Sequence, residues 1–463
     1  MSNVSRRLFF WVGSLLLAVA TAPMQVRAQV TLFQNVQIFD GIHDELSPPS
    51  FVLVRGNRIE RISSSPIPTD RRGDTVLIDG SGCTLMPGLI DAHTHLLFSL
   101  VPQQAALMSD AGFLHVVSTR AASDTLMRGF TSVRDLGGPV FGLKKGIDSG
   151  LVVGPRIWPS GAFISQSGGH GDFRMPNEFP APANSLSVSE RMGGSAIADD
   201  AATVRKRARE LLGLGASQIK LMAGGGVSSP YDPIDVTQYT VEELRAAVEA
   251  AENWGTYVTV HAYTPKAVRQ AIEAGVRCID HGQLLDDDTG KLMADKKVWW
   301  SLQPFLDDRP SPFAEGSPNR LKQLEMYQGT DLAYKLAKKY KIQTAWGTDN
   351  LFSAEGAKLQ GAQLAKMTRW YTPVEVLKMA TSGNAALLAL SGKRAPYEGK
   401  LGVIESDALA DLILVRGNPL EEIELIANPS KAFIVIMKDG KIFKNTVTAN
   451  TVTPNTVNSF PVD

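Results

Sequence analysis

The amino-acid sequence predicts an α/β fold, a (β/α)8 (TIM) barrel with a small β-sandwich domain built from both termini. Three observations lead to this prediction. Short apolar segments alternate with helical patterns through the middle of the 463-residue chain, and eight of them are countable as strands. Both ends carry short alternating strands with Gly and Asn at the turns. A doubly wound open sheet is the alternative, but no Gly-x-Gly-x-x-Gly motif follows the first middle strand.

The predicted domains follow one another along the chain. Residues 29–84 and 393–445 form the composite β-sandwich domain, residues 85–392 form the barrel, and residues 446–463 form a tail. The barrel strands are expected at 85–96, 130–135, 156–160, 218–222, 257–261, 277–281, 298–302 and 343–349, with one helical stretch at 103–128 after the first of them. Long segments after the third, fourth and seventh strands are expected to shape a pocket.

The composition is that of a globular protein. Apolar residues make up 44% and charged residues 20% of the chain, and 47 basic residues balance 47 acidic ones. This balance gives no indication of nucleic-acid binding or of attraction to an anionic membrane surface. Cys83 and Cys278 form no Cys-x-x-Cys zinc signature and no disulfide framework, so both are expected to be buried free thiols.

Residues 1–28 have the pattern of a signal peptide. Arg6 and Arg7 precede an apolar run too short to span a bilayer comfortably, and Val26-Arg27-Ala28 offers a small-residue cleavage site. Ala20-Thr21-Ala22 is a second site, which the proline after it disfavours. The twin arginine resembles a twin-arginine export signal, with an ordinary secretory signal as the alternative. Both predict an exported protein, periplasmic or secreted, and no other segment is apolar enough to cross a membrane.

Polar side chains gather at the predicted carboxyl ends of the barrel strands. His93 and His95 are separated by one residue, so on a strand their side chains point the same way. Other predicted strands contribute Lys220, His261, His281 and Asp349. A core histidine, a paired lysine or a capping aspartate would explain any one of them alone. In a barrel, however, these strand ends converge on one pocket, where several imidazoles indicate a metal site.

These residues together resemble the amidohydrolase superfamily. The run from Pro87 to His95, followed by the lysine, the two later histidines and the aspartate in that order, carries the resemblance over nearly the whole chain after residue 28. The segments 129–135, 167–171 and 381–386 are similar to those of one branch of the superfamily. That branch is related to imidazolonepropionase and contains metal-dependent prolidases, other dipeptidases and ochratoxin-type amidohydrolases.

The resemblance implies a centre with two divalent metal ions, usually zinc. The implied ligands are His93, His95 and Asp349 for one ion, and His261 and His281 for the other. The resemblance also implies that Lys220, carboxylated by CO₂, bridges both, because a bare lysine is cationic whereas its carbamate is an anionic oxygen ligand. These ligand types would also accept manganese or cobalt. Two metals lower the pKa of a bridging water to give hydroxide near neutral pH, and Asp349 can pass its proton to the leaving amine.

The predicted function is hydrolysis of the amide bond to a C-terminal amino acid. Dipeptides or N-acyl amino acids are the expected small-molecule substrates, and an ochratoxin-type amide is a further one. A cyclic amidohydrolase resembling imidazolonepropionase is the alternative enzyme, although export argues against histidine catabolism. A non-catalytic barrel homologue is the other alternative, but such a protein is expected to lose ligands and all six are present. No Gly-x-Ser-x-Gly or His-Glu-x-x-His motif offers a rival mechanism.

Residues of the long segments are candidates for substrate contact. His170 and Tyr231 are expected to contact the carbonyl oxygen or the substrate carboxylate, with Arg174 as a weaker candidate. The alternative is that all three are ordinary loop residues. The resemblance also implies a homo-oligomer.

Overall fold

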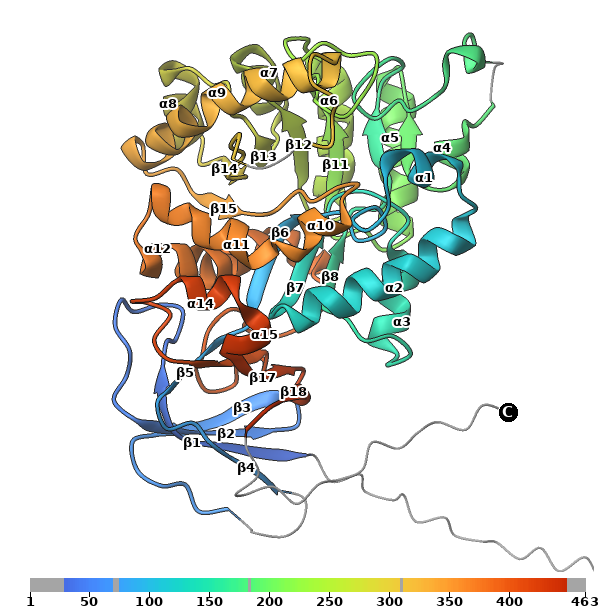
Figure 1. Ribbon diagram of the computed structural model, residues 1–463. Coiled ribbons are helices and arrows are strands. Elements are labelled where there is room, and N and C mark those ends of the chain that lie inside the picture. Colours follow the sequence, from blue (N-terminus) through green and yellow to red (C-terminus); the bar gives the residue numbers. More distant parts are fainter. Residues whose placement is uncertain (1–28, 70–74, 182–184, 309–310, 448–463) are drawn as a thin grey trace, which may run out of the picture.

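The computed structural model describes residues 29–69, 75–181, 185–308 and 311–447. These residues form an α/β part above a β-rich part, and the two ends of the described chain meet in the β-rich part (Figure 1). The predicted signal peptide at 1–28 and residues 448–463 of the predicted tail lie outside the described residues. Within the described ranges, no helix combines the length and the apolar character that crossing a bilayer requires.

The β-rich part is one eight-stranded sheet in the order β18-β17-β16-β5-β1-β2-β3, with β4 paired to β1. The bounds are β1 (Val30–Ile38), β2 (Ser50–Arg55), β3 (Arg58–Ser63), β4 (Thr75–Asp79), β5 (Cys83–Pro87), β16 (Leu412–Arg416), β17 (Phe433–Lys438) and β18 (Lys441–Asn445). Buried side chains of both ends, among them Val52, Ile78, Leu414 and Val435, belong to one hydrophobic cluster. The two termini therefore share one sheet and one core, as the alternating patterns predicted.

The α/β part contains a three-stranded sheet, β6-β7-β8, and a seven-stranded sheet, β10-β9-β11-β12-β13-β14-β15. The bounds are β6 (Leu89–Thr94), β7 (Phe130–Asp135), β8 (Arg156–Pro159), β9 (Phe163–Ser165), β10 (Ser195–Ile197), β11 (Ile219–Met222), β12 (Val258–Ala262), β13 (Cys278–His281), β14 (Trp299–Leu302) and β15 (Thr344–Trp346). All paired strands within these two sheets are parallel.

Main-chain hydrogen bonds connect the two parallel sheets at two places. Asp349, after β15, donates its N–H to the carbonyl of His93 on β6 at 2.8 Å. Ser217, before β11, donates its N–H to the carbonyl of Pro159 at the end of β8 at 2.7 Å. The third expected strand, at 156–160, is found as β8, and a further short strand that was not expected, β9, follows it.

Helices lie between the parallel strands and cover them on the outside (Figure 1). The longer ones are α2 (Ala111–Met127), α3 (Phe141–Asp148), α5 (Ala201–Gly213), α6 (Val241–Asn253), α7 (Pro265–Ala274), α8 (Asp287–Asp295) and α9 (Pro318–Lys339). The shorter ones are α1 (Gln103–Met108), α4 (Val188–Arg191), α10 (Ala354–Lys358), α11 (Gln360–Ala365), α12 (Pro373–Lys378), α13 (Asn384–Leu388), α14 (Glu424–Ala427) and α15 (Pro429–Ala432).

The helical stretch expected at 103–128 is two helices rather than one. Asp110 has an extended backbone, and its side chain accepts a hydrogen bond from the N–H of Phe113 at 3.0 Å. Such a cap satisfies a donor that the first helical turn leaves free, so it begins α2 and separates it from α1.

A buried ion pair connects the two parts of the protein. Arg156 of β8 donates from Nε to Oδ2 of Asp411 at 2.9 Å and from Nη2 to Oδ1 of Asp439 at 2.6 Å. Asp411 Oδ1 also accepts the N–H of Asp439 at 2.7 Å. Both members of the Arg156–Asp411 pair are almost fully buried, so neither charge has water as a substitute partner.

We predict that Asp411→Ala lowers the free energy of unfolding by about 3 kcal/mol, because it leaves the Arg156 charge buried with only one carboxylate. Urea unfolding followed by circular dichroism measures the change. Glu355→Ala, which removes an exposed partner of Lys358, is the control and is expected to change stability little. Equal midpoints for the two variants would contradict the proposed importance of this pair.

Candidate active site

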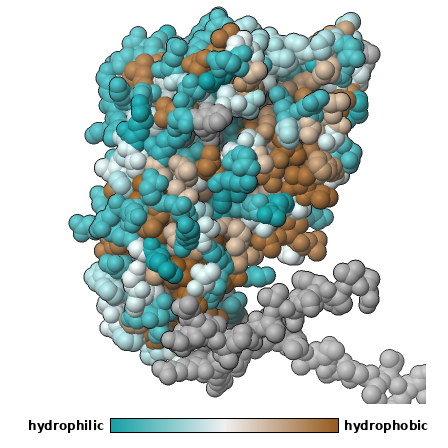
Figure 2. All heavy atoms as spheres, in the orientation of Figure 1, coloured by the Kyte–Doolittle hydropathy of each residue, from teal (hydrophilic) through white to brown (hydrophobic). Residues whose placement is uncertain are grey.

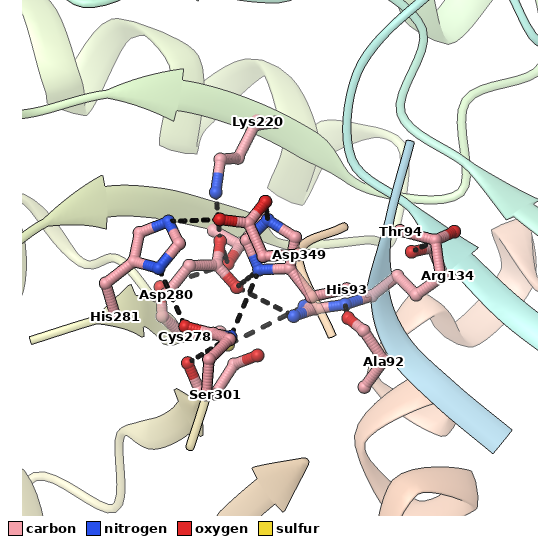
Figure 3. Close-up of polar contacts among 12 residues, drawn as sticks. Ala92, His93, Thr94, Arg134, Lys220, Cys278, Asp280, His281, Ser301 and Asp349 are labelled. Atoms are coloured by element: carbon pink, nitrogen blue, oxygen red, sulfur yellow. Dashed lines mark hydrogen bonds and ion pairs between the residues drawn. The ribbon is translucent and has the colours of Figure 1, made fainter. Parts of the chain in front are cut away.

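A cavity of about 790 Å³ lies at the carboxyl ends of the parallel strands. Seven of the residues singled out from the sequence line it: His93, His95, Lys220, His261, His281, Asp349 and His170. The structure therefore brings all six predicted metal ligands, which come from five different strands or strand ends, into one pocket. Several of them point toward one another above the strands (Figure 3).

His93, His95 and Asp349 form the tightest group. Oδ1 of Asp349 lies 3.3 Å from Nε2 of His93 and 3.2 Å from Nε2 of His95. One potential ligand atom from each residue lies within 4.8 Å of the others, so the three could hold a metal ion. His281 is adjacent, with Nε2 at 4.0 Å from Oδ2 of Asp349, and the ring of His261 lies 4.6 Å from the ring of His281.

In two of the candidate ligands, the ring nitrogen that points away from the cavity contacts a main-chain carbonyl oxygen. Nδ1 of His95 lies 3.3 Å from the carbonyl of Gly137, and Nε2 of His261 lies 3.0 Å from the carbonyl of Gly225. A carbonyl oxygen accepts but does not donate, so each of these nitrogens carries the hydrogen of a neutral ring. The opposite nitrogen then keeps its lone pair, which is the arrangement that metal-ligating histidines require.

Burial keeps three histidines of this pocket neutral. It lowers the pKa of His93 and His261 well below the ordinary value and the pKa of His281 to about 4. A neutral imidazole is the form that binds a metal ion, so the protein does not have to displace protons from these rings near neutral pH.

Asp280 is a buried acid that the sequence analysis did not include. Its Oδ2 accepts a hydrogen bond from Nζ of Lys220 at 2.5 Å and from the hydroxyl of Thr259 at 2.7 Å, and its Oδ1 accepts from Nη2 of Arg134 at 2.8 Å (Figure 3). Burial lowers the pKa of the Lys220 amine, although the charge of Asp280 opposes that shift. The sequence did contain a signal for this residue, because Asp280 is an acidic residue inside a short buried strand, directly before His281.

Two of the candidate ligands have an unusual backbone. His281 has φ of 77° and Asp349 has φ of 49°, in the left-handed region that non-glycine residues seldom adopt. Such strain persists only where surrounding contacts hold it and is concentrated at functional sites. Gly347, just before Asp349, is needed for close approach, because a Cβ there would lie 2.5 Å from the nitrogen of His93.

His170 reaches the cavity from the long segment after β9. Its ring stacks on that of His261 at 4.1 Å between centroids, and its Nδ1 lies 2.7 Å from the hydroxyl of Ser229 and 3.4 Å from Oδ2 of Asp232. Gly226 makes this position available, because a Cβ there would lie 2.0 Å from the His170 ring. The structure therefore brings His170 into the cavity beside the candidate ligand His261, and its contact with the substrate stays a prediction.

The structure does not bring Tyr231 or Arg174 to the cavity. The hydroxyl of Tyr231 donates to the main-chain carbonyl of Arg174 at 2.6 Å, and Arg174 itself donates from Nε to Oδ1 of Asp172 at 2.8 Å. Neither is among the residues that line the cavity. In this structure the hydrogen bonds of both residues lie within the loops, so the cavity lining gives no support to their predicted contact with a substrate, which stays a prediction.

The walls of the cavity are mainly apolar. The larger side chains include Phe98, Phe163, Met222, Phe305, Phe313 and Met326. Met108 lines the cavity and is also 77% exposed, so the apolar wall continues onto the outer surface there. Figure 2 shows apolar surface over α1 and α2, and α1 also lines the cavity.

The sequence profile of the amidohydrolase family matches residues 84–444. The chain belongs to this family. Ochratoxinase from Aspergillus niger is 32% identical over 380 residues, which cover 78% of this chain and 75% of the relative. A crystal structure of a prolidase complexed with N-methylphosphonate-L-proline is 33% identical, with a TM-score of 0.82, and the match covers 90% of this chain and 100% of that one.

A third relative is a Xaa-Pro dipeptidase whose crystal structure has methionine bound in the active site. It is 27% identical, with a TM-score of 0.77, and the match covers 90% of this chain and 100% of that one. These findings confirm the resemblance seen in the sequence. The chain is therefore an enzyme, a hydrolase that acts on amides, in a family that is generally metal-dependent.

We predict that metal-free protein loses stability between pH 6.5 and 4 partly through His281. The unfolded chain protonates this residue near pH 6.5, whereas the folded chain holds its pKa at about 4, so the unfolded state binds more protons in this window. His281→Asn is expected to remove roughly 3 kcal/mol of the pH-dependent loss, measured by urea unfolding at pH 7 and pH 4. His115→Asn on α2 is the control, and an identical loss in both variants would contradict the prediction.

Proposed function

We propose that this protein is a metal-dependent amidohydrolase that cleaves the amide bond to a C-terminal amino acid. The observation that carries the proposal is the convergence of four histidines, a lysine and an aspartate on one cavity. Two of the relatives support an amino-acid amide as the substrate class, because a prolidase and a Xaa-Pro dipeptidase cleave bonds to an amino acid. Dipeptides and N-acyl amino acids are the proposed substrates, with ochratoxin-type amides suggested by the ochratoxinase relative.

A site of this kind needs a closed barrel whose strand ends surround one pocket. We infer that the two parallel sheets form one (β/α)8 barrel, closed where Asp349 bonds to His93 and where Ser217 bonds to Pro159. Residues 29–84 and 393–445 then form the composite β-sandwich domain. β5 continues to Pro87, so its pairing with β16 extends slightly past that boundary.

The residues present fit a centre of two divalent metal ions, with zinc preferred. His93, His95 and Asp349 would hold one ion and His261 and His281 the other, with Lys220 as a bridging carbamate. The neutral rings, with lone pairs directed into the cavity, support this fit. When bound, such ions acidify a water molecule and polarise the scissile carbonyl.

The chain's own residues supply proton transfer and orientation. Burial would raise the pKa of Asp349, but hydrogen bonding to His95 and the nearby charge of Lys220 hold it below the ordinary value, so this carboxylate is ionised and can accept a proton. It would pass that proton to the nitrogen of the leaving amine. His170 would contact the carbonyl oxygen of the scissile bond, and the hydrogen bond between its ring and Ser229 supports this role by fixing the ring.

The walls of the cavity supply the binding energy for the other half of the substrate. Aromatic and methionine side chains exclude water and offer dispersion contacts to an apolar acyl group. A cavity of about 790 Å³ is also large for a small dipeptide. We therefore propose that bulky apolar acyl groups are preferred over small ones, with differences of roughly 1–3 kcal/mol per methylene that contacts the wall.

Metal removal combined with a substrate panel tests the proposed function. Purified protein is expected to contain two ions per chain and to lose hydrolysis of N-acyl amino acids and dipeptides on treatment with a chelator. Zinc, manganese or cobalt with bicarbonate, which supplies CO₂ for Lys220, is expected to restore it. Activity confined to cyclic amides would favour the imidazolonepropionase-like alternative, and intact two-metal protein without hydrolysis of any amide would favour a non-catalytic homologue.

We predict that His170→Ala lowers kcat/KM by about 10²–10³, the usual cost of losing a hydrogen-bond donor to a developing oxyanion. Tyr231→Phe is the matched control, because its hydroxyl contacts the Arg174 carbonyl rather than the cavity, and it is expected to change kcat/KM little. Steady-state kinetics on an N-acyl amino acid measures both. A large loss in Tyr231→Phe with a small one in His170→Ala would reverse the two assignments.

Export and assembly are also proposals. We propose that residues 1–28 direct export to the periplasm or the medium and that the protein is a homo-oligomer. The apolar surface over α1 and α2 offers an area for contact between subunits (Figure 2).

A further inference from the structure

Gln303 lies directly after β14 and is completely buried beneath the candidate metal ligands. Its Nε2 lies 3.1 Å from the carbonyl of Ser301, and its Oε1 lies 2.7 Å from Nδ1 of His281. Nε2 also lies 3.4 Å from Nδ1 of His93. One amide group therefore contacts two of the predicted ligands, one from each proposed metal site.

The Ser301 carbonyl determines which way the amide of Gln303 faces. A carbonyl oxygen only accepts hydrogen bonds, so the NH₂ group must lie on the Ser301 side and the amide oxygen must face His281. The amide oxygen also only accepts, so Nδ1 of His281 must carry the hydrogen. The lone pair of a neutral His281 ring is then on Nε2, the nitrogen that lies 4.0 Å from Asp349 in the cavity.

We propose that Gln303 is a positioning residue that holds His281 in the tautomer and orientation required for metal binding. This inference rests on the proposed function, because it assigns Gln303 to the second of the proposed metal sites. The comparable outer contacts of His95 and His261 are to main-chain carbonyls, which no substitution removes. The contact of His281 is to a side chain, so it is the one that a substitution can test directly.

Gln303→Leu and Gln303→Glu separate this role from simple packing. Leucine fills similar space but offers Nδ1 no acceptor, so the ring is free to turn or to change tautomer. Glutamate keeps an acceptor for Nδ1 and, when protonated on its other oxygen, also keeps a donor for Ser301. Loss of such an outer partner typically lowers metal affinity by about 10–100-fold, and we expect that loss in Gln303→Leu with recovery in Gln303→Glu.

Gln363→Leu is the matched control. Gln363 is also a buried glutamine, but it lies on α11, and neither atom of its side-chain amide has a hydrogen-bond partner among the described residues. Thermal unfolding of the metal-free proteins should show whether Gln303→Leu costs more stability than this control. If these two variants melt at the same temperature, any difference in their metal binding arises at the site and not from a general loss of stability.

The experiment equilibrates full-length wild type and the three variants with buffered free Zn²⁺ and measures zinc per chain by mass spectrometry. We expect Gln303→Leu to lose one ion per chain at a zinc concentration where the wild type, Gln303→Glu and Gln363→Leu keep two. Wild-type zinc retention in Gln303→Leu, or equal loss in Gln303→Glu, would overturn the inference. Wild type that binds no zinc would instead overturn the proposed function.

A second measurement does not depend on metal. In metal-free protein labelled with ¹⁵N-histidine, the His281 signal, assigned by its absence in His281→Asn, reports which ring nitrogen carries the hydrogen. We expect Nδ1 to carry it in the wild type and Gln303→Glu, and both tautomers to be present in Gln303→Leu. A wild-type His281 with its hydrogen on Nε2 would overturn the inference whatever the metal content.

Discussion

The ion cluster around Asp280 is the constraint on which the rest of the site depends. Its carboxylate holds Lys220 of β11 and Arg134 of β7, and Arg134 also donates to the carbonyl of Ala92 on β6 at 2.6 Å. Each of these charged groups is buried, so none has solvent as an alternative partner. The cluster thus fixes the relative positions of four strands, β6, β7, β11 and β13, directly below the histidines, and with them the geometry of any metal centre above.

The histidines above this cluster are prepared for ligation by contacts on their far side. Burial keeps His261 and His281 uncharged, and a carbonyl or amide oxygen determines which nitrogen of each carries the hydrogen. The left-handed backbone of His281 and Asp349 shows that local preference gives way to these tertiary contacts. The chemistry of the site is therefore built into rigid strand ends rather than into the mobile side chains of loops.

The walls of the cavity serve a different purpose. The proposed metal ligands would define a reaction class that many substrates could share, whereas the apolar side chains around them would define what fits. The long segment after β9 supplies His170, and the hydrogen bonds of Arg174, in the same segment, and of Tyr231, after β11, hold the two loops together. Reaction class and selectivity are thus assigned to different residues of one cavity.

The sequence by itself determined the parallel α/β middle, the pairing of both termini in one sheet and the six candidate ligands, because strand periodicity and residue types at strand ends are local properties. Only the tertiary structure showed Asp280, Gln303 and the outward contacts of Tyr231. A buried polar side chain is functional or structural according to which partner lies within hydrogen-bonding distance, and that partner is distant in sequence. Such pairings form only when the chain folds, so the identity of a single residue in the sequence does not predict them.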